Sequence, residues 1–189
     1  MKIVQQTFPT TLPVELELIK SQLRIDGTDE DILISNRVKS AQSFIEQYTN
    51  RCLLSSTFIA YLDEYPETEL WIYKFPITAI TAVKYYNSAG TLTTMTNGTD
   101  YVYSIKDCPA KVKFLTNPAI QTDIYDGIEI HFTAGHADLE DIDKGIIEAL
   151  NLIVGSFNEN RQNESSFNVN EIPLNYKNIL NMYVKGTYL

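Results

Sequence analysis

Apolar residues recur at helical spacing near both ends of the chain. A first helix is predicted at residues 14–24, where Leu16, Ile19 and Leu23 are spaced to share one face. A longer helix is predicted at residues 28–50, because its apolar positions follow one another at intervals of four, three, four and three residues. These positions are Ile34, Val38, Ala41, Ile45 and Tyr48.

The boundary between these two helices carries clear local signals. Gly27 is expected to end the first helix, and Thr28 with Asp31 three residues later resembles a capping box. Asp29 and Glu30 add negative charge to the first turn of the next helix, where the helix dipole favours it. These residues therefore predict a capped helix start rather than an acidic catalytic site.

The middle of the chain changes to short runs that are rich in β-branched and aromatic residues. Turn signals such as Asn97-Gly98 separate these runs, as expected for antiparallel strands. In the clearest run, Ile128, Ile130 and Phe132 alternate with polar residues and are predicted to share one buried face. The predicted strands are 58–62, 70–73, 80–86, 101–105, 112–115 and 127–133.

An acidic segment, residues 138–143, is then expected to open a second long helix. Ile147, Leu150 and Val154 widen its apolar stripe, which predicts a largely buried helix. Residues 158–170 have the composition of a polar loop, and Pro173 is expected to start a last short helix. The stripe of the long helix is Ile142, Ile146, Ala149, Ile153 and Phe157. The apolar side of the last helix is Leu174, Ile179 or Leu180, and Tyr183.

The order of these elements predicts an α+β fold. The N- and C-terminal helices must cover each other, because no single helix can bury its stripe alone. They form a helical bundle at residues 13–54 and 138–189, and an antiparallel β-lobe is inserted between them at residues 55–135. The whole chain, residues 1–189, is predicted to be one domain.

Length and charge narrow the class of protein. The chain has 189 residues, of which 44% are hydrophobic and 21% charged, as in an ordinary globular protein. Its apolar runs are too short to span a membrane, and its first six residues lack the apolar core of a signal peptide, so neither a membrane nor export is expected. The net charge of −9 argues against a grip on nucleic acid, although it suits a surface that DNA passes without sticking.

Two histidines are the first candidates for chemistry. His131 lies in a predicted strand and His136 in the loop after it, so the pair lacks the helical spacing that brings metal ligands together. Glu129, Asp138 or Glu140 would have to complete a metal site. A histidine on a polar strand face and a histidine in a loop explain the sequence more simply. No metal and no cofactor are therefore predicted.

Other candidate chemistry is equally sparse. A nucleophilic pair of Cys52 or Cys108 with a histidine has no local sequence typical of such a site. The glycines are scattered singly, so no phosphate-binding loop is predicted. Lys106, Lys111 and Lys113 lie near tyrosines that could stack on nucleic acid, but a solvated strand face is the simpler interpretation. No catalytic residue is predicted, and a scaffold or binding protein is favoured.

Several weak structural motifs follow one another in a specific order. The first is Leu23-Arg24-Ile25-Asp26 with an acidic turn and then AQSFIEQYTNR at 41–51. Phe75-Pro76-Ile77, IHFTAGH at 130–136 and Ile172-Pro173 come later. In this order and spacing, over nearly the whole chain, the sequence resembles the small head–tail connector (adaptor or head-completion) proteins of tailed bacteriophages, in the group called gp6-like or phiE125 gp8-like. Two departures are His136, in place of an aromatic residue, and Asp143, where proline is common.

The resemblance implies a virion structural protein and no enzyme. Such proteins assemble in the host cytoplasm, at the head–tail interface, as a closed ring of about a dozen copies beneath the portal protein. The ring extends the channel through which DNA passes without specific binding. It also docks the next connector, a stopper or a tail protein. The expected partners are therefore further copies of the chain, the portal and that downstream component.

The resemblance further implies that the C-terminal region reaches toward the portal. The polar loop at 158–170 and the segment at 173–189 are accordingly the candidate partner contacts, because a polar segment followed by aromatic residues can order on docking. The candidate partner-binding residues are Pro173, Leu174, Tyr176, Tyr183, Tyr188 and Leu189.

Two alternatives remain open from the residues alone. One is a non-catalytic accessory module that binds carbohydrate or protein through the tyrosine-rich β-lobe. The other is a small hydrolase with a carboxylate or histidine site, for which the sequence offers almost no support. Assembly into a ring, or a stable complex with a portal protein, would separate the connector from both.

Overall fold

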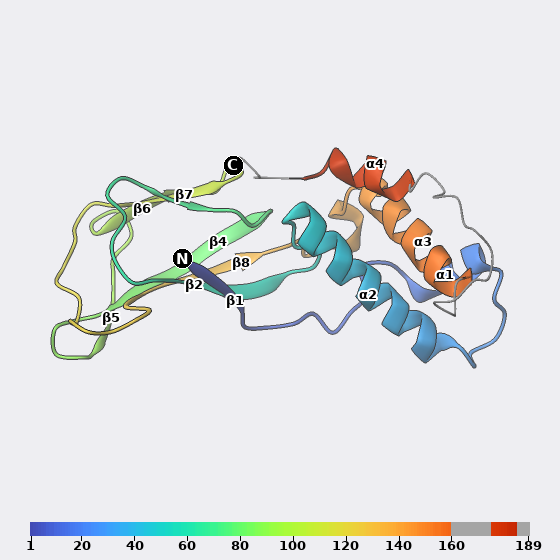
Figure 1. Cartoon of the computed structure of the whole chain (residues 1–189), viewed down its shortest axis with the longest axis horizontal. Helices are drawn as coiled ribbons and strands as arrows, with labels where there is room; N and C mark the ends of the chain where they lie inside the picture. Colours follow the sequence, from blue (N-terminus) through green and yellow to red (C-terminus); the bar gives the residue numbers. More distant parts are fainter. Residues whose placement is uncertain (160–174, 185–189) are drawn as a thin grey trace, which may run out of the picture. The chain divides into compact units, whose positions relative to one another are not determined.

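The chain folds into two compact units. The computed structural model describes residues 1–159 and 175–184. The strand unit comprises Met1–Pro9 and Leu54–Gly135, and the helical unit comprises Thr10–Leu53 with the described residues of His136–Val184 (Figure 1). Each unit therefore contains segments that are far apart in the sequence. That the two units act as one connector domain stays a prediction.

The helical unit is built from helices of both chain ends. Its elements are α1 (Leu16–Leu23), α2 (Asp31–Thr49), the 3-10 turn η1 (Leu139–Asp141), α3 (Lys144–Glu159) and α4 (Asn175–Asn181). Helix α2 packs against α3, and α4 packs against both. Four of the five predicted stripe positions of α2 are confirmed, since Ile34, Val38, Ala41 and Ile45 are fully buried, whereas Tyr48 is only half-buried. Burial of these four side chains contributes to the stability of the helical unit.

The predicted start of α2 is wrong. The helix begins at Asp31 after Glu30, and Thr28 lies before it, in a turn where its carbonyl accepts the Asp31 N–H at 3.2 Å. The carboxylate of Asp31 instead lies 3.0 Å from Nζ of Lys20, whose side chain is buried in α1. The Asp31 carboxylate, which the local pattern assigned to a helix cap, thus forms a tertiary ion pair with Lys20 instead. It also helps to raise the pKa of Lys20, together with the neighbouring Glu17.

The prediction for α3 is confirmed in its centre and wrong at its end. Ile142, Ile146, Ala149 and Ile153 are buried, whereas Phe157 is 42% exposed. The acidic segment before the helix forms η1, so α3 begins only at Lys144. In the last helix Leu180 provides the buried apolar side chain. Pro173 and Leu174, which were expected to start it, lie outside the described residues.

The strand unit contains two antiparallel sheets. The five-stranded sheet has the order β1-β2-β8-β4-β5, and the three-stranded sheet has the order β3-β7-β6. In Figure 1, β6 and β7 lie along one side of the larger sheet. The strands of the larger sheet are β1 (Lys2–Gln5), β2 (Ser56–Leu62), β4 (Ile77–Tyr86), β5 (Leu92–Thr94) and β8 (Ile128–Ala134). Those of the smaller sheet are β3 (Leu70–Ile72), β6 (Tyr101–Ser104) and β7 (Ala110–Phe114).

Six of these eight strands were predicted, and two were missed. β1 lies before the first predicted helix, and it pairs with β2 at the edge of the sheet. β5 has three residues and pairs with the end of β4. Both are short and half-exposed, so their sequences carry almost no alternation.

The core of the strand unit follows the predicted alternation of β8. Ile128, Ile130 and Phe132 are buried, and the Phe132 ring stacks on Phe58 of β2 with centroids 5.4 Å apart. Gly135 follows this strand with φ +103°, and a Cβ at this position would lie 2.3 Å from the Leu54 carbonyl oxygen. Glycine is thus required where the chain leaves the sheet.

These observations confirm the predicted fold class, a helical bundle of N- and C-terminal helices with an inserted antiparallel β-lobe. Among the described helices, none combines the length and apolar content needed to cross a membrane.

Candidate partner-binding site

Helix α4 is the described part of the predicted partner-contact segment. It is held on α2 by two aromatic side chains. The ring of Tyr176 contacts Phe44 edge to face, with centroids 5.9 Å apart, and Tyr48 Oη donates a 2.6 Å hydrogen bond to Asn181 Oδ1. Leu180 is fully buried beneath the helix. The helix is therefore an integral part of the bundle.

Arg51 fixes the chain directly after α4. Its side chain is only 6% exposed, and its Nε donates a 3.0 Å hydrogen bond to the carbonyl of Tyr183. The same guanidinium lies 5.4 Å from the centre of the Tyr183 ring and 3.4 Å from a carboxylate oxygen of Asp143. One side chain thus joins the end of α2, the start of α3 and the end of α4, through an ion pair, a hydrogen bond and a cation–π contact.

Gly145 makes room for this arrangement in the first turn of α3. A Cβ at this position would lie 2.4 Å from Tyr183 Oη and 3.0 Å from two of its ring carbons. Glycine therefore lets the tyrosine ring approach the backbone of α3 closely. Neither Arg51 nor Gly145 was identified as functional from the sequence, because their partner lies more than 30 residues away and no local pattern marks the contact.

The predicted partner-binding residues divide into two groups. Tyr176 and Tyr183 are half-buried and make the contacts within the chain described above, so their role in binding a partner stays a prediction. Pro173, Leu174, Tyr188 and Leu189 lie outside the described residues. The outward side of α4 and the following turn carries Lys177, Asn178 and Met182, the last of which is 73% exposed. These three exposed residues were not among the candidates chosen from the sequence.

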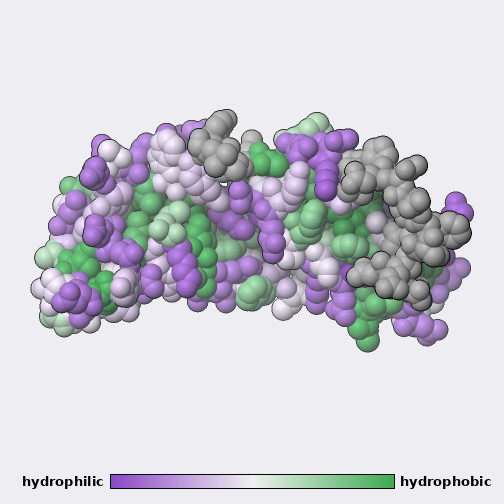
Figure 2. Space-filling view, in the orientation of Figure 1, coloured by the Kyte–Doolittle hydropathy of each residue, from purple (hydrophilic) through white to green (hydrophobic). Residues whose placement is uncertain are grey.

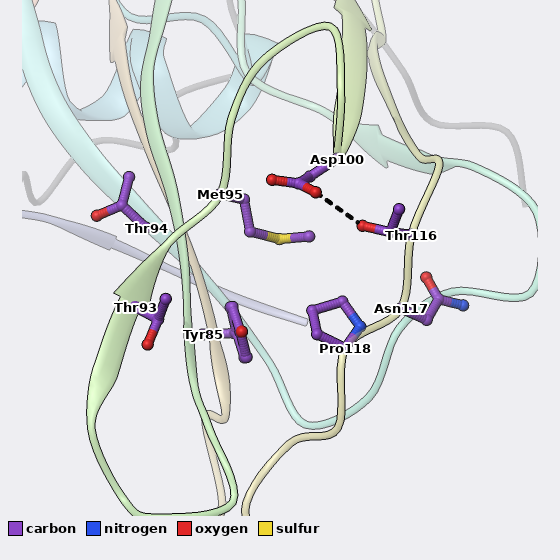
Figure 3. Close-up of a pocket in the computed structure, with 8 residues that line it drawn as sticks. All are labelled: Tyr85, Thr93, Thr94, Met95, Asp100, Thr116, Asn117 and Pro118. Carbon is purple, nitrogen blue, oxygen red and sulfur yellow. Dashed lines mark hydrogen bonds between the residues drawn. The ribbon is translucent and has the colours of Figure 1, made fainter.

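The strand unit has an open hollow of about 490 Å³ beside β5 (Figure 3). Its acidic residue, Asp100, accepts hydrogen bonds from the Thr96 backbone N–H at 2.7 Å and from Thr116 Oγ1 at 3.1 Å. In Figure 3 this carboxylate faces Thr116, while Met95 extends into the hollow. The carboxylate thus holds two loops together. The hollow is lined by Tyr85, Thr93, Thr94, Met95, Asp100, Thr116, Asn117 and Pro118.

The histidines considered for chemistry have separate surroundings. His131, in β8, lies with its Nε2 2.8 Å from Oε2 of Glu129, its neighbour on the same strand face. His136 belongs to the helical unit, and partial burial lowers the pKa of its imidazole below the ordinary value. Within residues 1–159 and 175–184, no group of three or more His, Cys, Asp or Glu side chains is arranged to hold a metal ion.

Solved structures share the fold of this chain. The fold matches a chain in the neck of an empty gene transfer agent particle, computed with C6 symmetry, with a TM-score of 0.83, 19% identity and coverage of 100% of this chain and 98% of that chain. A chain in the virion of a native gene transfer agent particle gives a TM-score of 0.81, 20% identity and the same coverage. A third, in the neck of the native particle computed with C12 symmetry, gives a TM-score of 0.74, 17% identity and the same coverage. At these identities the likeness establishes the fold.

The family is established by sequence. The model of the phage gp6-like head-tail connector proteins matches residues 13–111, just over half of the chain, and the protein therefore belongs to this family. It is a structural protein of the virion, of the head–tail connector class, as its motifs predicted. Comparison with curated protein sequences finds no match.

Proposed function

We propose that the protein forms a closed ring of about twelve copies beneath the portal, extends the DNA channel and docks the next connector or tail component. The observation that carries this proposal is the fold, which the whole chain shares with proteins of gene transfer agent necks. The structures of these necks were computed with C6 and C12 symmetry. Membership of the head–tail connector family supports it independently.

The charge of the chain suits a channel for DNA. Its net charge is −9, and hydrophilic side chains are interspersed with apolar ones over the face seen in Figure 2. An acidic lumen repels phosphate, so DNA would slide through the ring without being retained. A ring whose lumen carried a continuous basic stripe would contradict this part of the proposal.

The C-terminal region is our candidate for portal contact. Helix α4 exposes Lys177 and Asn178, and the turn after it exposes Met182, while the other side of the helix is fixed to the bundle. Removal of the whole region after residue 170 would also remove Leu180 and expose the core. Deletion of residues 185–189, which include Tyr188 and Leu189, is therefore the cleaner test.

The test compares the binding of four forms of the protein to portal-bearing heads: the wild type, a short deletion, a point variant and a control. We expect wild-type protein to bind, the 185–189 deletion to bind at least about tenfold more weakly, and Met182→Asp to be similarly impaired. Lys39→Asp, an exposed change on α2, is the matched control. Electron microscopy of the heads should show a ring with wild-type protein. Heads that lack a ring would contradict the proposed ring. Binding that is unchanged in both C-terminal variants would contradict the proposed portal contact.

A further inference from the structure

Trp71 is the only tryptophan of the chain, and it stands on the outer face of β3 with 45% of its surface exposed. Three neighbours nevertheless fix its orientation. Its Nε1 donates a 3.0 Å hydrogen bond to Glu69, Nζ of Lys111 lies 5.7 Å from its ring centroid, and the Tyr73 ring lies 6.5 Å away. A large aromatic ring that is both rigid and open to solvent has the properties of an interface anchor.

The strands beside Trp71 extend this surface. The antiparallel register pairs Trp71 with Lys111 and Val102 with Lys113, and all four side chains are exposed. The alternate residues of the same strands, such as Ile72 and Val112, are fully buried. We call the surface formed by Trp71, Val102, Lys111 and Lys113 the Trp–Lys face.

A second surface of the strand unit has the opposite charge. The Asp126 N–H donates a 2.8 Å hydrogen bond to Asp63 Oδ1 and so joins the loop after β2 to the loop before β8. Tyr125 is 86% exposed between these acids. In Figure 1 the connection from β7 to β8 runs past β5. We call this surface the acidic loop face, formed by Asp63, Glu64, Asp123, Tyr125 and Asp126, all of them exposed.

We propose that the Trp–Lys face of one copy packs on the acidic loop face of the next copy in the ring. The inference rests on the proposed ring, because a closed ring of identical chains is built from a heterologous contact between two different surfaces of each chain. Each face carries exposed aromatic surface, and the two lysines of one meet four carboxylates of the other. The charges therefore set the register, and Trp71 and Tyr125 supply the buried area.

A second copy fits these observations better than DNA does. Two lysines beside Glu69 offer few phosphate contacts, and each contact contributes only a small share of nucleic-acid affinity. DNA would also leave the exposed Tyr125 and its surrounding acids without a role. A neighbouring copy uses both faces at once.

Charge reversal with rescue tests the pairing in the full-length chain. Lys111→Glu/Lys113→Glu should weaken ring formation by about tenfold or more, because like charges then face each other. Glu64→Lys/Asp123→Lys should do the same while keeping the hydrogen bond between Asp63 and Asp126. The combination of all four changes should restore assembly. Lys39→Glu/Lys144→Glu, two exposed lysines of the helical unit, changes the net charge equally and should assemble normally.

Rings are measured by native mass spectrometry of the purified chain and by electron microscopy of particles assembled with each variant. Because Trp71 is the sole tryptophan, its emission should shift to shorter wavelength, and its quenching by iodide should fall, as the purified chain assembles. Melting curves show whether each variant is folded.

The outcomes separate this inference from the proposed function. If the wild-type chain forms no ring, either purified or on particles, the proposed function fails. If wild-type rings form but the lysine reversal leaves them intact, or the four changes together fail to restore assembly, the pairing of these two faces is overturned and the ring stands. If the lysine reversal alters only DNA retention in the particles, the Trp–Lys face is a DNA contact and the pairing is likewise overturned.

Discussion

The Arg51 guanidinium lies over the Tyr183 ring, 5.4 Å from its centre, and donates a 3.0 Å hydrogen bond to the carbonyl of the same residue. These residues are separated by 132 positions in the chain. The contact joins the last residues of the described chain to the end of α2. Because α4 is the segment proposed to meet the portal, this contact couples the stability of the bundle to the presentation of a partner-binding helix.

Replacement of Arg51 by alanine should therefore destabilise the helical unit. Arg51 is buried and loses a hydrogen bond, a cation–π contact and packing along its stem, so we expect the free energy of unfolding to fall by about 2 kcal/mol. The ion pair adds little to this figure, because Asp143 is half-exposed. Urea denaturation followed by circular dichroism measures the change. Lys39→Ala is the exposed control, and an equal effect of both substitutions would contradict this role of Arg51.

Two glycines of α3 should respond in opposite directions to alanine. Gly145→Ala places a Cβ 2.4 Å from Tyr183 Oη, so the ring must move away from Arg51, and we expect a loss of about 1–2 kcal/mol. Gly155 lies in the interior of α3, and a Cβ at this position would meet no neighbouring atom within 4 Å. Gly155→Ala should therefore stabilise the protein by about 0.5–1 kcal/mol. Thermal unfolding of the two variants gives the comparison. Stabilisation by both substitutions would show that Tyr183 does not pack as described.

Most of the fold could be predicted from long periodic segments of the sequence. The stripes of α2 and α3 and the alternation of β8 each bury one face, so their patterns state both the element and its orientation. The predicted burial of Phe157 and the predicted cap at Thr28 were wrong for the same reason. Each was judged from local pattern, whereas the end of α3 is open to solvent and Asp31 is engaged by Lys20 from another helix.

The candidate site was less predictable than the fold. The family motifs located the C-terminal region, but not which of its side chains point outward. Tyr183 was assigned both to the apolar side of the last helix and to the candidate partner contacts, and the structure packs it against Arg51 and Gly145. Met182 and Trp71 are exposed, but apolar residues read from a sequence are normally assigned to a core. Only the three-dimensional surroundings distinguish these cases.

The opposite sides of α4 should separate folding from binding. Leu180 is fully buried, so Leu180→Ala should lower the free energy of unfolding by about 2–4 kcal/mol through the cavity that it leaves. Met182 is 73% exposed, and Met182→Ala should change it by less than about 0.5 kcal/mol. Chemical denaturation measures both values. A large loss of stability from Met182→Ala would mean that this residue is part of the core and not of a partner surface.

The pH dependence of stability should contain a contribution from His136. Burial lowers the pKa of this imidazole in the folded state below its ordinary value of 6.5, so the unfolded chain binds the proton more readily. The stability associated with the neutral ring is fully present above pH 6.5 and declines as the pH falls toward the folded-state pKa. Nearby Asp141 and Asp143 oppose the shift, and Arg51 adds to it.

His136→Gln removes the titrating group and should flatten this part of the decline. Unfolding free energies measured by urea titration between pH 7.5 and pH 5 should converge for wild type and variant at the upper end after correction for a constant offset. They should diverge below about pH 6.5, with the wild type losing more stability. The rest of the chain is unchanged, so the difference between the two curves reports on the imidazole and its interactions. Parallel curves over the whole range would show that the imidazole has the same pKa folded and unfolded.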